Sequence, residues 1–351
     1  MDGDTRAMTG NGELDAGALL SFLRWHLDDG QLPGLRLDEP LHITPLPDGR
    51  THRTTLVRAG GAELVLRRPL AGPHSDGTHD VAREYRWLTA LHPVFPLAPR
   101  PYLFCEDAAV LGVPFSVVER RRGLVAGGDE PMPLAGHPHL RRGVSEAVVE
   151  TLARLHDVDT GTAAFADLGS PVGVLDRTVR EWTDRWRHVR LGPVPAMDTL
   201  ALWLTAHQPP DSLDPAVVHG DFRLEHILLN PLRPSEPVAV LDWETASLGD
   251  PLADLGGMLA WWTGPDGAGS VDGERGVTGR PGYFSRAELI DAYARRSGRD
   301  VSSVAYFEVL AHFRRAVGIQ QRSAAGGGRA PDAAVRVAAV AAHALSLASE
   351  A

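Results

Sequence analysis

The chain has 351 residues, of which 43% are hydrophobic and 23% charged, so its composition is typical of a soluble globular protein and indicates neither disorder nor a fibrous architecture. Its 45 acidic and 35 basic side chains give a net charge of -10, which argues against a nucleic-acid partner. We find no run of about 18 apolar residues, as a membrane span would need. The single cysteine and a start without a signal pattern favour a cytoplasmic protein.

The first third of the chain predicts a small lobe of strands and helices. A helix begins behind a possible cap at Asp15, strands with polar turns fill 41–68, a helix covers 81–91, and a strand covers 110–119. A basic stretch rich in Gly and Pro then marks a boundary. The predicted divisions are a disordered N-terminus over 1–14, an N-terminal lobe over 15–119 and a C-terminal lobe over 120–351.

The rest of the chain predicts a larger, mainly helical lobe, so the fold class is α+β. Two short apolar runs, 217–218 and 238–241, interrupt the helices as strands, and the Gly-rich segment 264–282 is typical of a surface loop. The predicted helices are 140–156, 174–189, 197–206, 285–297, 304–321 and 333–349.

The first chemical motif lies where an apolar pair leads into polar residues and then into a second apolar run. Its polar residues include His219, Asp221, Arg223 and His226. A turn between two buried ends holds such groups at a cost unless they are hydrogen-bonded or used. This cost favours a functional site, although for His219 a structural role is the stronger interpretation.

The second motif is an apolar strand, 238–241, that ends in Asp242-Trp243-Glu244. Carboxylates at i and i+2 of an extended chain face the same side. Phosphoryl transfer needs oxygen ligands for Mg²⁺, a carboxylate that accepts the proton of the attacking hydroxyl, and cations around the phosphates. Asp242, Asp221 and Arg223 have the chemistry for these three tasks.

The two motifs together resemble the aminoglycoside phosphotransferase-like (choline kinase-like) family, which has a bilobed protein-kinase-like fold with an N-terminal antiparallel sheet plus a helix. The run from Val240 to Leu255 resembles one subgroup in particular. That subgroup is the kinase-like domain fused to some acyl-CoA dehydrogenases, with its free-standing bacterial relatives.

The resemblance implies a kinase that uses ATP or GTP with Mg²⁺ or Mn²⁺. It makes Asp221 the catalytic base, with Arg223 beside it, and Asp242 the metal ligand. His226 stands where the family has an Asn ligand, and imidazole is a softer ligand that suits Mn²⁺ better than it suits Mg²⁺. Glu244 contacts the metal through water or pairs with a local Arg.

The resemblance also implies residues that bind the nucleotide. Arg67 reaches the phosphates and pairs with Glu84, while Glu119 and Arg120 belong to the hinge. Thr51 lies in the loop 49–54, where only one glycine of the family's pair is present. The implied partner is a small-molecule hydroxyl acceptor, which is a hydroxyacyl thioester, a hydroxy acid or an antibiotic-like compound.

Two other functions stay open. The departures at His226 and at 49–54 are also compatible with a pseudokinase that binds a nucleotide or ligand with weak or no phosphotransfer. A metal-dependent hydrolase has less support, because no second ligand cluster is evident. Asp250 and Asp254 are predicted to cap or brace the helix that follows them, and Trp261-Trp262 to line an apolar acceptor pocket or to pack.

Overall fold

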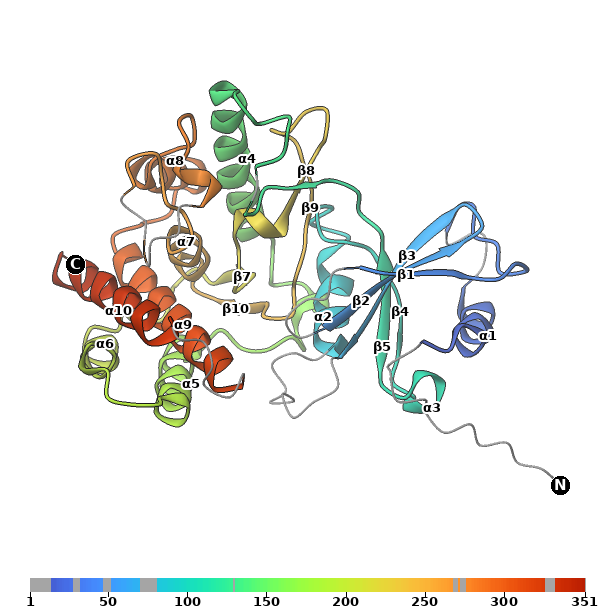
Figure 1. Ribbon diagram of the computed structural model, residues 1–351, viewed down its shortest axis with the longest axis horizontal. Coiled ribbons are helices and arrows are strands. Elements are labelled where there is room, and N and C mark those ends of the chain that lie inside the picture. The colour runs from blue at the N-terminus through green and yellow to red at the C-terminus, as the bar shows by residue number, and fades with distance from the viewer. Residues whose placement is uncertain are drawn as a thin grey trace. The chain divides into compact units, whose positions relative to one another are not determined.

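The computed structural model describes residues 14–27, 32–46, 52–69, 81–128, 130–267, 271, 276–325 and 332–350. The chain divides into two compact units, the first from Met1–His92 and Pro99–Arg120 and the second from Pro93–Ala98 and Arg121–Ala351 (Figure 1). The predicted α+β fold class is confirmed, because an antiparallel sheet fills the first unit and helices dominate the second.

The first unit is built on a five-stranded antiparallel sheet in the order β1-β2-β3-β5-β4. Its central hairpin joins β2 to β3 through Gly60 and Gly61, and Gly60 adopts a φ of 62° that favours glycine. The sheet contains β1 (His42–Pro45), β2 (His52–Ala59), β3 (Ala62–Pro69), β4 (Pro101–Cys105) and β5 (Phe115–Glu119).

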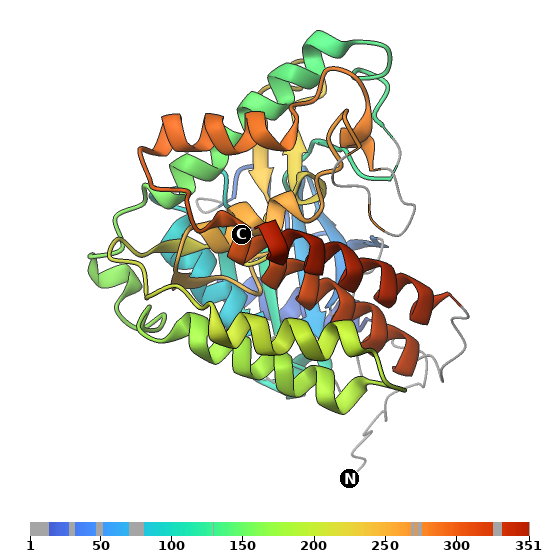
Figure 2. The same cartoon turned by 90° about the vertical axis from the view of Figure 1, so that its left-hand side faces the viewer.

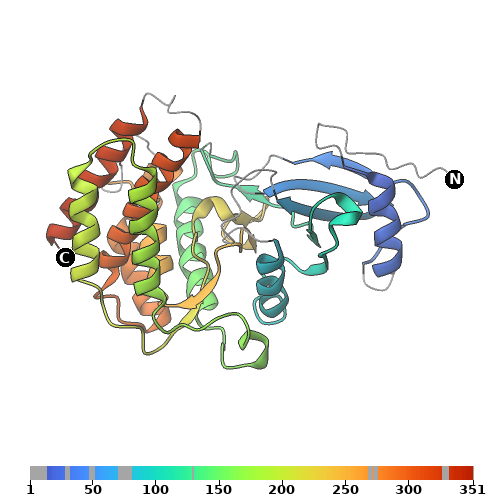
Figure 3. The same cartoon turned by 90° about the horizontal axis from the view of Figure 1, so that it is seen from below.

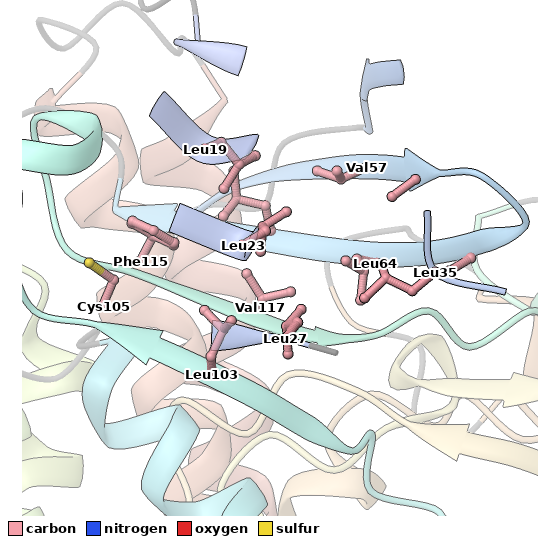
Figure 4. Packing of buried hydrophobic residues seen from close by; sticks show 13 residues of the cluster. Leu19, Leu23, Leu27, Leu35, Val57, Leu64, Leu103, Cys105, Phe115 and Val117 are labelled. Carbon is pink, nitrogen blue, oxygen red and sulfur yellow. The ribbon is translucent and has the colours of Figure 1, made fainter. Parts of the chain in front are cut away.

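The helix α1 (Ala16–His26) begins behind Asp15, whose carboxylate accepts the N–H of Ala18 at 2.9 Å as the sequence predicts. It places Leu19, Leu23 and Leu27 on one face of the sheet (Figure 4). The helix α2 (Val81–Leu91) packs against β3, β4 and β5. Leu64 and Leu66 of β3 belong to the core beneath α1. Since side chains alternate along a strand, Val65 between them faces away from α1.

The predicted strand over 110–119 is wrong in its first half. Residues Ala108–Leu111 form the short helix α3, capped by Asp107, whose carboxylate accepts the N–H of Ala109 at 2.8 Å. Gly112 ends this helix with a φ of 80°. The strand β5 starts only at Phe115. The apolar run between Asp107 and Phe115 predicts a strand, although Asp107 caps a helix there and Gly112 ends it.

The second unit consists of helices with two small sheets among them (Figure 3). Its helices are α4 (Pro138–His156), α5 (Val174–Val189), α6 (Pro195–Ala206), α7 (Leu252–Leu259), α8 (Arg286–Ser297), α9 (Val304–Ala325) and α10 (Ala333–Glu350). Its strands are β6 (Leu124–Val125), β7 (Ala216–Val218), β8 (Ile227–Leu229), β9 (Pro237–Val240) and β10 (Ser247–Gly249). The six helices predicted here are confirmed with ends that differ by a few residues.

The strands of the two small sheets flank the two chemical motifs of the sequence. β7 pairs with β10, and β8 lies between β6 and β9, each pair antiparallel. The first motif runs from β7 to β8, and the second runs from β9 to β10. Within the predicted loop 264–282, the described residues include one short 3₁₀ turn, Val277–Gly279.

The helix α10 is the one described helix that is long and apolar enough to cross a membrane, which by itself is weak evidence for a span. Its face formed by Val337, Val340, Ala341 and Ala344 is buried, and it packs along α9 (Figure 2). Over the apolar window of this helix, 28% of the residues are buried.

Candidate active site

The predicted catalytic segment His219-Gly220-Asp221, which we call the catalytic turn, follows directly on the buried strand β7. Gly220 adopts a φ of 84°, and a Cβ atom at this position would lie 2.7 Å from the backbone oxygen of Thr245. Thr245 also donates its hydroxyl to the carbonyl of His219 at 2.9 Å. The turn is therefore shaped by a close contact that only glycine permits.

The carboxylate of Asp254 holds the backbone of the catalytic turn by hydrogen bonds. Its two carboxylate oxygens accept the backbone N–H groups of His219 at 2.6 Å and of Gly220 at 2.7 Å. His156 lies 3.3 Å from the same carboxylate, and its other ring nitrogen is 2.6 Å from the hydroxyl of Tyr293. With only 1% of Asp254 exposed, this carboxylate is buried between the turn and His156 and supports the turn's backbone.

The two aspartates that flank the start of α7 thus have different tasks. Asp250 accepts the N–H of Leu252 at 2.8 Å, which agrees with its predicted role at the helix start. Asp254 was predicted to brace its own helix, but it braces the catalytic turn instead. The sequence could not reveal this, because the two partners are 34 and 35 residues apart.

His219 is fixed as a neutral imidazole. Its Nε2–H donates to the carbonyl of Leu241 at 2.9 Å, and its Nδ1 accepts the N–H of Asp221 at 3.3 Å. Burial lowers the pKa of His219, which keeps this tautomer uncharged. These bonds support the structural role and join the catalytic turn to the residue before Asp242.

Asp242 has a left-handed backbone with a φ of 70°, the only non-glycine among the described residues with a positive φ. Such a conformation costs on the order of 1–3 kcal/mol and is common at functional sites. It also invalidates the expectation that Asp242 and Glu244 face the same side, because the chain is no longer extended here. The side chain of Asp242 is 35% exposed, whereas Glu244 is buried at 7%.

Asp221, His226 and Asp242 form a group whose potential ligand atoms all lie within 4.8 Å of one another. The Nδ1–H of His226 donates to the carbonyl of Asp221 at 2.8 Å, so the lone pair is on Nε2. That Nε2 lies 3.7 Å from Asp242 Oδ2. Among the described residues, Glu244 is not part of this group.

Arg223 closes one side of the group. Its Nη2 donates to His226 Nε2 at 3.2 Å, and its Nε is 3.6 Å from Asp221 Oδ1. Its Nη1 pairs with Glu225 at 2.9 Å, and its guanidinium stacks over Trp261 at 4.7 Å. The side chain is mostly buried, so its charge acts in a poorly hydrated place.

Two further arginines of α9 were not predicted. Arg315 stacks on Trp261 at 4.4 Å, and Arg314 donates to the carbonyl of Gly220 at 3.3 Å. Burial lowers the pKa of Arg314. Trp261 thus lies among cations instead of lining an apolar pocket, while Trp262 is a core residue whose indole N–H donates to Phe284.

The residues predicted to bind a nucleotide lie in the first unit. Arg67 of β3 and Glu84 of α2 form an ion pair with Nε and Oε2 2.7 Å apart, and Glu84 is buried. Arg67 also donates to His52 at 3.4 Å. Glu119, at the end of β5, accepts the N–H of Arg100 at 3.0 Å. Arg120 is the last residue of this unit, and Thr51 lies outside the described residues.

A five-stranded antiparallel sheet with a buried Arg–Glu pair, and a helical unit with paired aspartates at strand ends, define a protein of the protein-kinase-like class. The chain belongs to the phosphotransferase enzyme family, whose model matches residues 42–306. The expected resemblance and fold are thereby confirmed.

Named relatives agree with this membership. The chain is 33% identical over 289 residues to acyl-CoA dehydrogenase family member 11 of Gallus gallus, which covers 80% of this chain and 36% of the relative. It is 30% identical over 315 residues to the Homo sapiens protein of the same name, with 88% and 39% covered. The chain thus spans less than half the length of these relatives.

Solved structures are similar over nearly the whole chain. A candidate aminoglycoside phosphotransferase from Ralstonia eutropha matches with a TM-score of 0.78 and 27% identity, covering 96% of this chain and 99% of the other. Choline kinase from Cryptosporidium parvum matches with a TM-score of 0.63 and 12% identity, covering 96% of each chain. The second likeness concerns the fold alone.

Proposed function

We propose that this protein transfers the γ-phosphoryl group of ATP or GTP to a hydroxyl of a small molecule, as a cytoplasmic enzyme. The observation that supports this most strongly is the group of Asp221, His226 and Asp242. The group is assembled from two separate strand ends in a chain of a phosphotransferase family.

Asp221 is the proposed base. Its side chain is 38% exposed, so a substrate hydroxyl can reach it. As the hydroxyl oxygen forms its bond to the γ-phosphorus, the bond from that phosphorus to the bridging oxygen breaks, and a nucleoside diphosphate leaves. The hydroxyl proton passes to the carboxylate of Asp221. Arg223 offers a nearby positive charge to the transferred group.

Asp242 and His226 are the proposed metal ligands. A carboxylate suits Mg²⁺, and the Nε2 lone pair of His226, which would exchange its hydrogen bond from Arg223 for the ion, is better suited to Mn²⁺. The bound ion would neutralise charge on the phosphates of the nucleotide. Glu244 stays a prediction as an outer partner that acts through water, since it is not part of the group of Asp221, His226 and Asp242 among the described residues.

For the nucleotide we propose the Arg67–Glu84 pair of the first unit. The buried Glu84 holds the guanidinium of Arg67 at the end of β3, which would orient its charge toward a phosphate. Thr51, Glu119 and Arg120 are proposed as further contacts on the basis of the sequence resemblance.

For the acceptor we propose an anionic hydroxy compound. Arg223 and Arg315 stack on Trp261, and Arg314 contacts the catalytic turn, so three guanidiniums lie near Asp221, of which Arg223 is also paired with Glu225. Such surroundings favour a carboxylate or phosphate on the acceptor and disfavour a cationic antibiotic. A hydroxy acid or a hydroxyacyl thioester fits this chemistry.

The test is to incubate the protein with ATP or GTP, with Mg²⁺ or Mn²⁺, and with matched hydroxy acids, hydroxyacyl thioesters, macrolides and aminoglycosides. We expect a new phosphomonoester signal by ³¹P NMR with an anionic acceptor. A metal-dependent rise in Tm with nucleotide but no product with any acceptor would favour a pseudokinase. Ester or phosphate hydrolysis without nucleotide would favour a hydrolase and contradict the proposal.

A further inference from the structure

A second group of possible metal ligands, which the sequence did not reveal, lies between α9 and α10 and shares no residue with the active-site group. Glu308 and His312 are four residues apart on α9, which places them on one face of that helix. His343 comes from α10, and its ring centroid is 4.8 Å from that of His312. We call these three residues the His–His–Glu cluster. Their ligand atoms lie within 4.8 Å of one another.

The ring nitrogens of this cluster lack ordinary hydrogen bonds. His312 is only 1% exposed, and among the described residues neither of its nitrogens has a hydrogen-bond partner. Its Nε2 is 3.6 Å from Glu308 Oε1, which is beyond hydrogen-bond length. The Nε2 of His343 is also buried without such a partner. Each unsatisfied group costs about 1–3 kcal/mol, so a ligand that uses these atoms would relieve a real penalty.

Both imidazoles are neutral and so offer lone pairs. Burial lowers the pKa of His312, and it lowers the pKa of His343 to about 4. Ring nitrogens of His312 on α9 and of His343 on α10 are therefore available as ligands at neutral pH without the loss of a proton.

The charges around the cluster select the kind of ion. Glu308 pairs with Arg286 through Oε1, which is also the oxygen 3.6 Å from His312 Nε2, so the arginine and the ion would share this carboxylate. Arg315 is a further positive charge that acts on both histidines. One carboxylate against two guanidiniums disfavours hard ions held by charge, such as Mg²⁺ or Ca²⁺. Two imidazole nitrogens favour Zn²⁺ or a similar transition metal.

We propose that Glu308, His312 and His343 bind one Zn²⁺-class ion, which ties α10 to α9. Two histidines, one carboxylate and a water form a familiar four-coordinate zinc environment. Binding would draw the donor atoms to roughly 3.3 Å from one another, the spacing that tetrahedral Zn–N bonds of about 2.0–2.1 Å require. Because α9 also bears Arg314, the ion would steady the helix that contacts the catalytic turn.

The test compares zinc binding by the full chain and three variants, by equilibrium dialysis with elemental analysis. His343→Asn removes one ligand at a half-buried position. Asp242→Asn changes the active-site group, and His188→Asn changes an exposed histidine of α5 as a control. We expect one zinc ion per chain in the wild type, Asp242→Asn and His188→Asn. In His343→Asn we expect an affinity lower by about a hundredfold or more.

Two results would overturn the proposal: no zinc retained by the wild type, or equal retention by His343→Asn. If His343→Asn does not fold, Co²⁺ spectra of the other proteins decide. A tetrahedral Co²⁺ absorption that persists in Asp242→Asn supports the His–His–Glu cluster, and its loss in that variant assigns the ion to the active site.

Discussion

The two ends of the candidate active site are held in opposite ways. The catalytic turn is fixed by buried bonds from Asp254 and His219 and by the close contact of Gly220. At the other end, Asp242 has a strained left-handed backbone and a side chain that is 35% exposed, with His226 3.7 Å away. The backbone that positions the proposed base is therefore fixed by buried bonds, whereas the proposed metal ligands can adjust to an ion. Changes at the turn should affect folding and turnover together, and changes at the strand end should affect metal preference.

The largest effect on stability is expected at the turn's main support. Asp254→Ala would leave the N–H groups of His219 and Gly220 and the ring of His156 without their acceptor. Removing one partner of a buried charged network costs about 3–5 kcal/mol. Urea unfolding measures this loss, and the exposed Asp167→Asn is the control that should stay within about 0.5 kcal/mol of the wild type. Equal stability of the two variants would refute the role of Asp254.

A second effect should appear at Gly220. Gly220→Ala forces a left-handed alanine against Thr245, so we expect a loss of about 1–3 kcal/mol, with lower turnover as well. The matched control is Gly257→Ala in α7, where no heavy atom lies within 4 Å of the added Cβ. That change should gain about 0.5–1 kcal/mol, because alanine favours a helix. The same sign for both variants in thermal unfolding would contradict the tight-turn explanation.

At the strand end the expected change concerns the choice of metal. His226→Asn supplies an amide oxygen in place of the imidazole nitrogen, so the ratio of kcat/KM with Mg²⁺ to that with Mn²⁺ should rise by about tenfold. The free energy of unfolding should fall by about 1–2 kcal/mol, because the side chain is 14% exposed and its bonds with Asp221 and Arg223 change. An unchanged metal ratio would show that His226 is not a ligand.

A further effect concerns pH, with metal removed by a chelator. Burial lowers the pKa values of His219, His312 and His343 in the folded chain. Below their unfolded pKa of about 6.5, the unfolded chain therefore binds protons that the folded chain does not. The free energy of unfolding should fall as pH falls from 7 toward 5, and His343→Asn should flatten this slope. A stability that rises over this interval would contradict the neutral state of these histidines.

The sequence predicted the architecture well where a pattern repeats. The six predicted helices of the second unit show clear apolar periodicity, and each forms. The strand predicted over 110–119 failed because Asp107 and Gly112 define a short helix within an apolar run. A helix cap is difficult to predict from sequence when the residues beside it also have a high propensity for strands.

The sequence predicted the side chains of the two motifs, but it did not predict the backbone of Asp242 or the arginines that approach the motifs from α9. Asp221 and Asp242 were expected from their motifs and His226 from the family resemblance, and the three lie together. The left-handed backbone of Asp242 was not foreseen, and it separates Asp242 from Glu244. Arg314 and Arg315 were also missed, because their contacts with the turn and with Trp261 depend on how α9 packs. Long-range partners of this kind leave no signal in local sequence.

The most direct test of the central claim is Asp221→Asn, measured on an acceptor that the wild type phosphorylates. The amide cannot accept the hydroxyl proton as the carboxylate does, so kcat should fall by about 10²- to 10⁴-fold. The Kd for nucleotide with metal should stay within about threefold, because Asn keeps the size and the turn keeps its backbone bonds. Wild-type turnover in Asp221→Asn would contradict the assignment of Asp221 as the catalytic base.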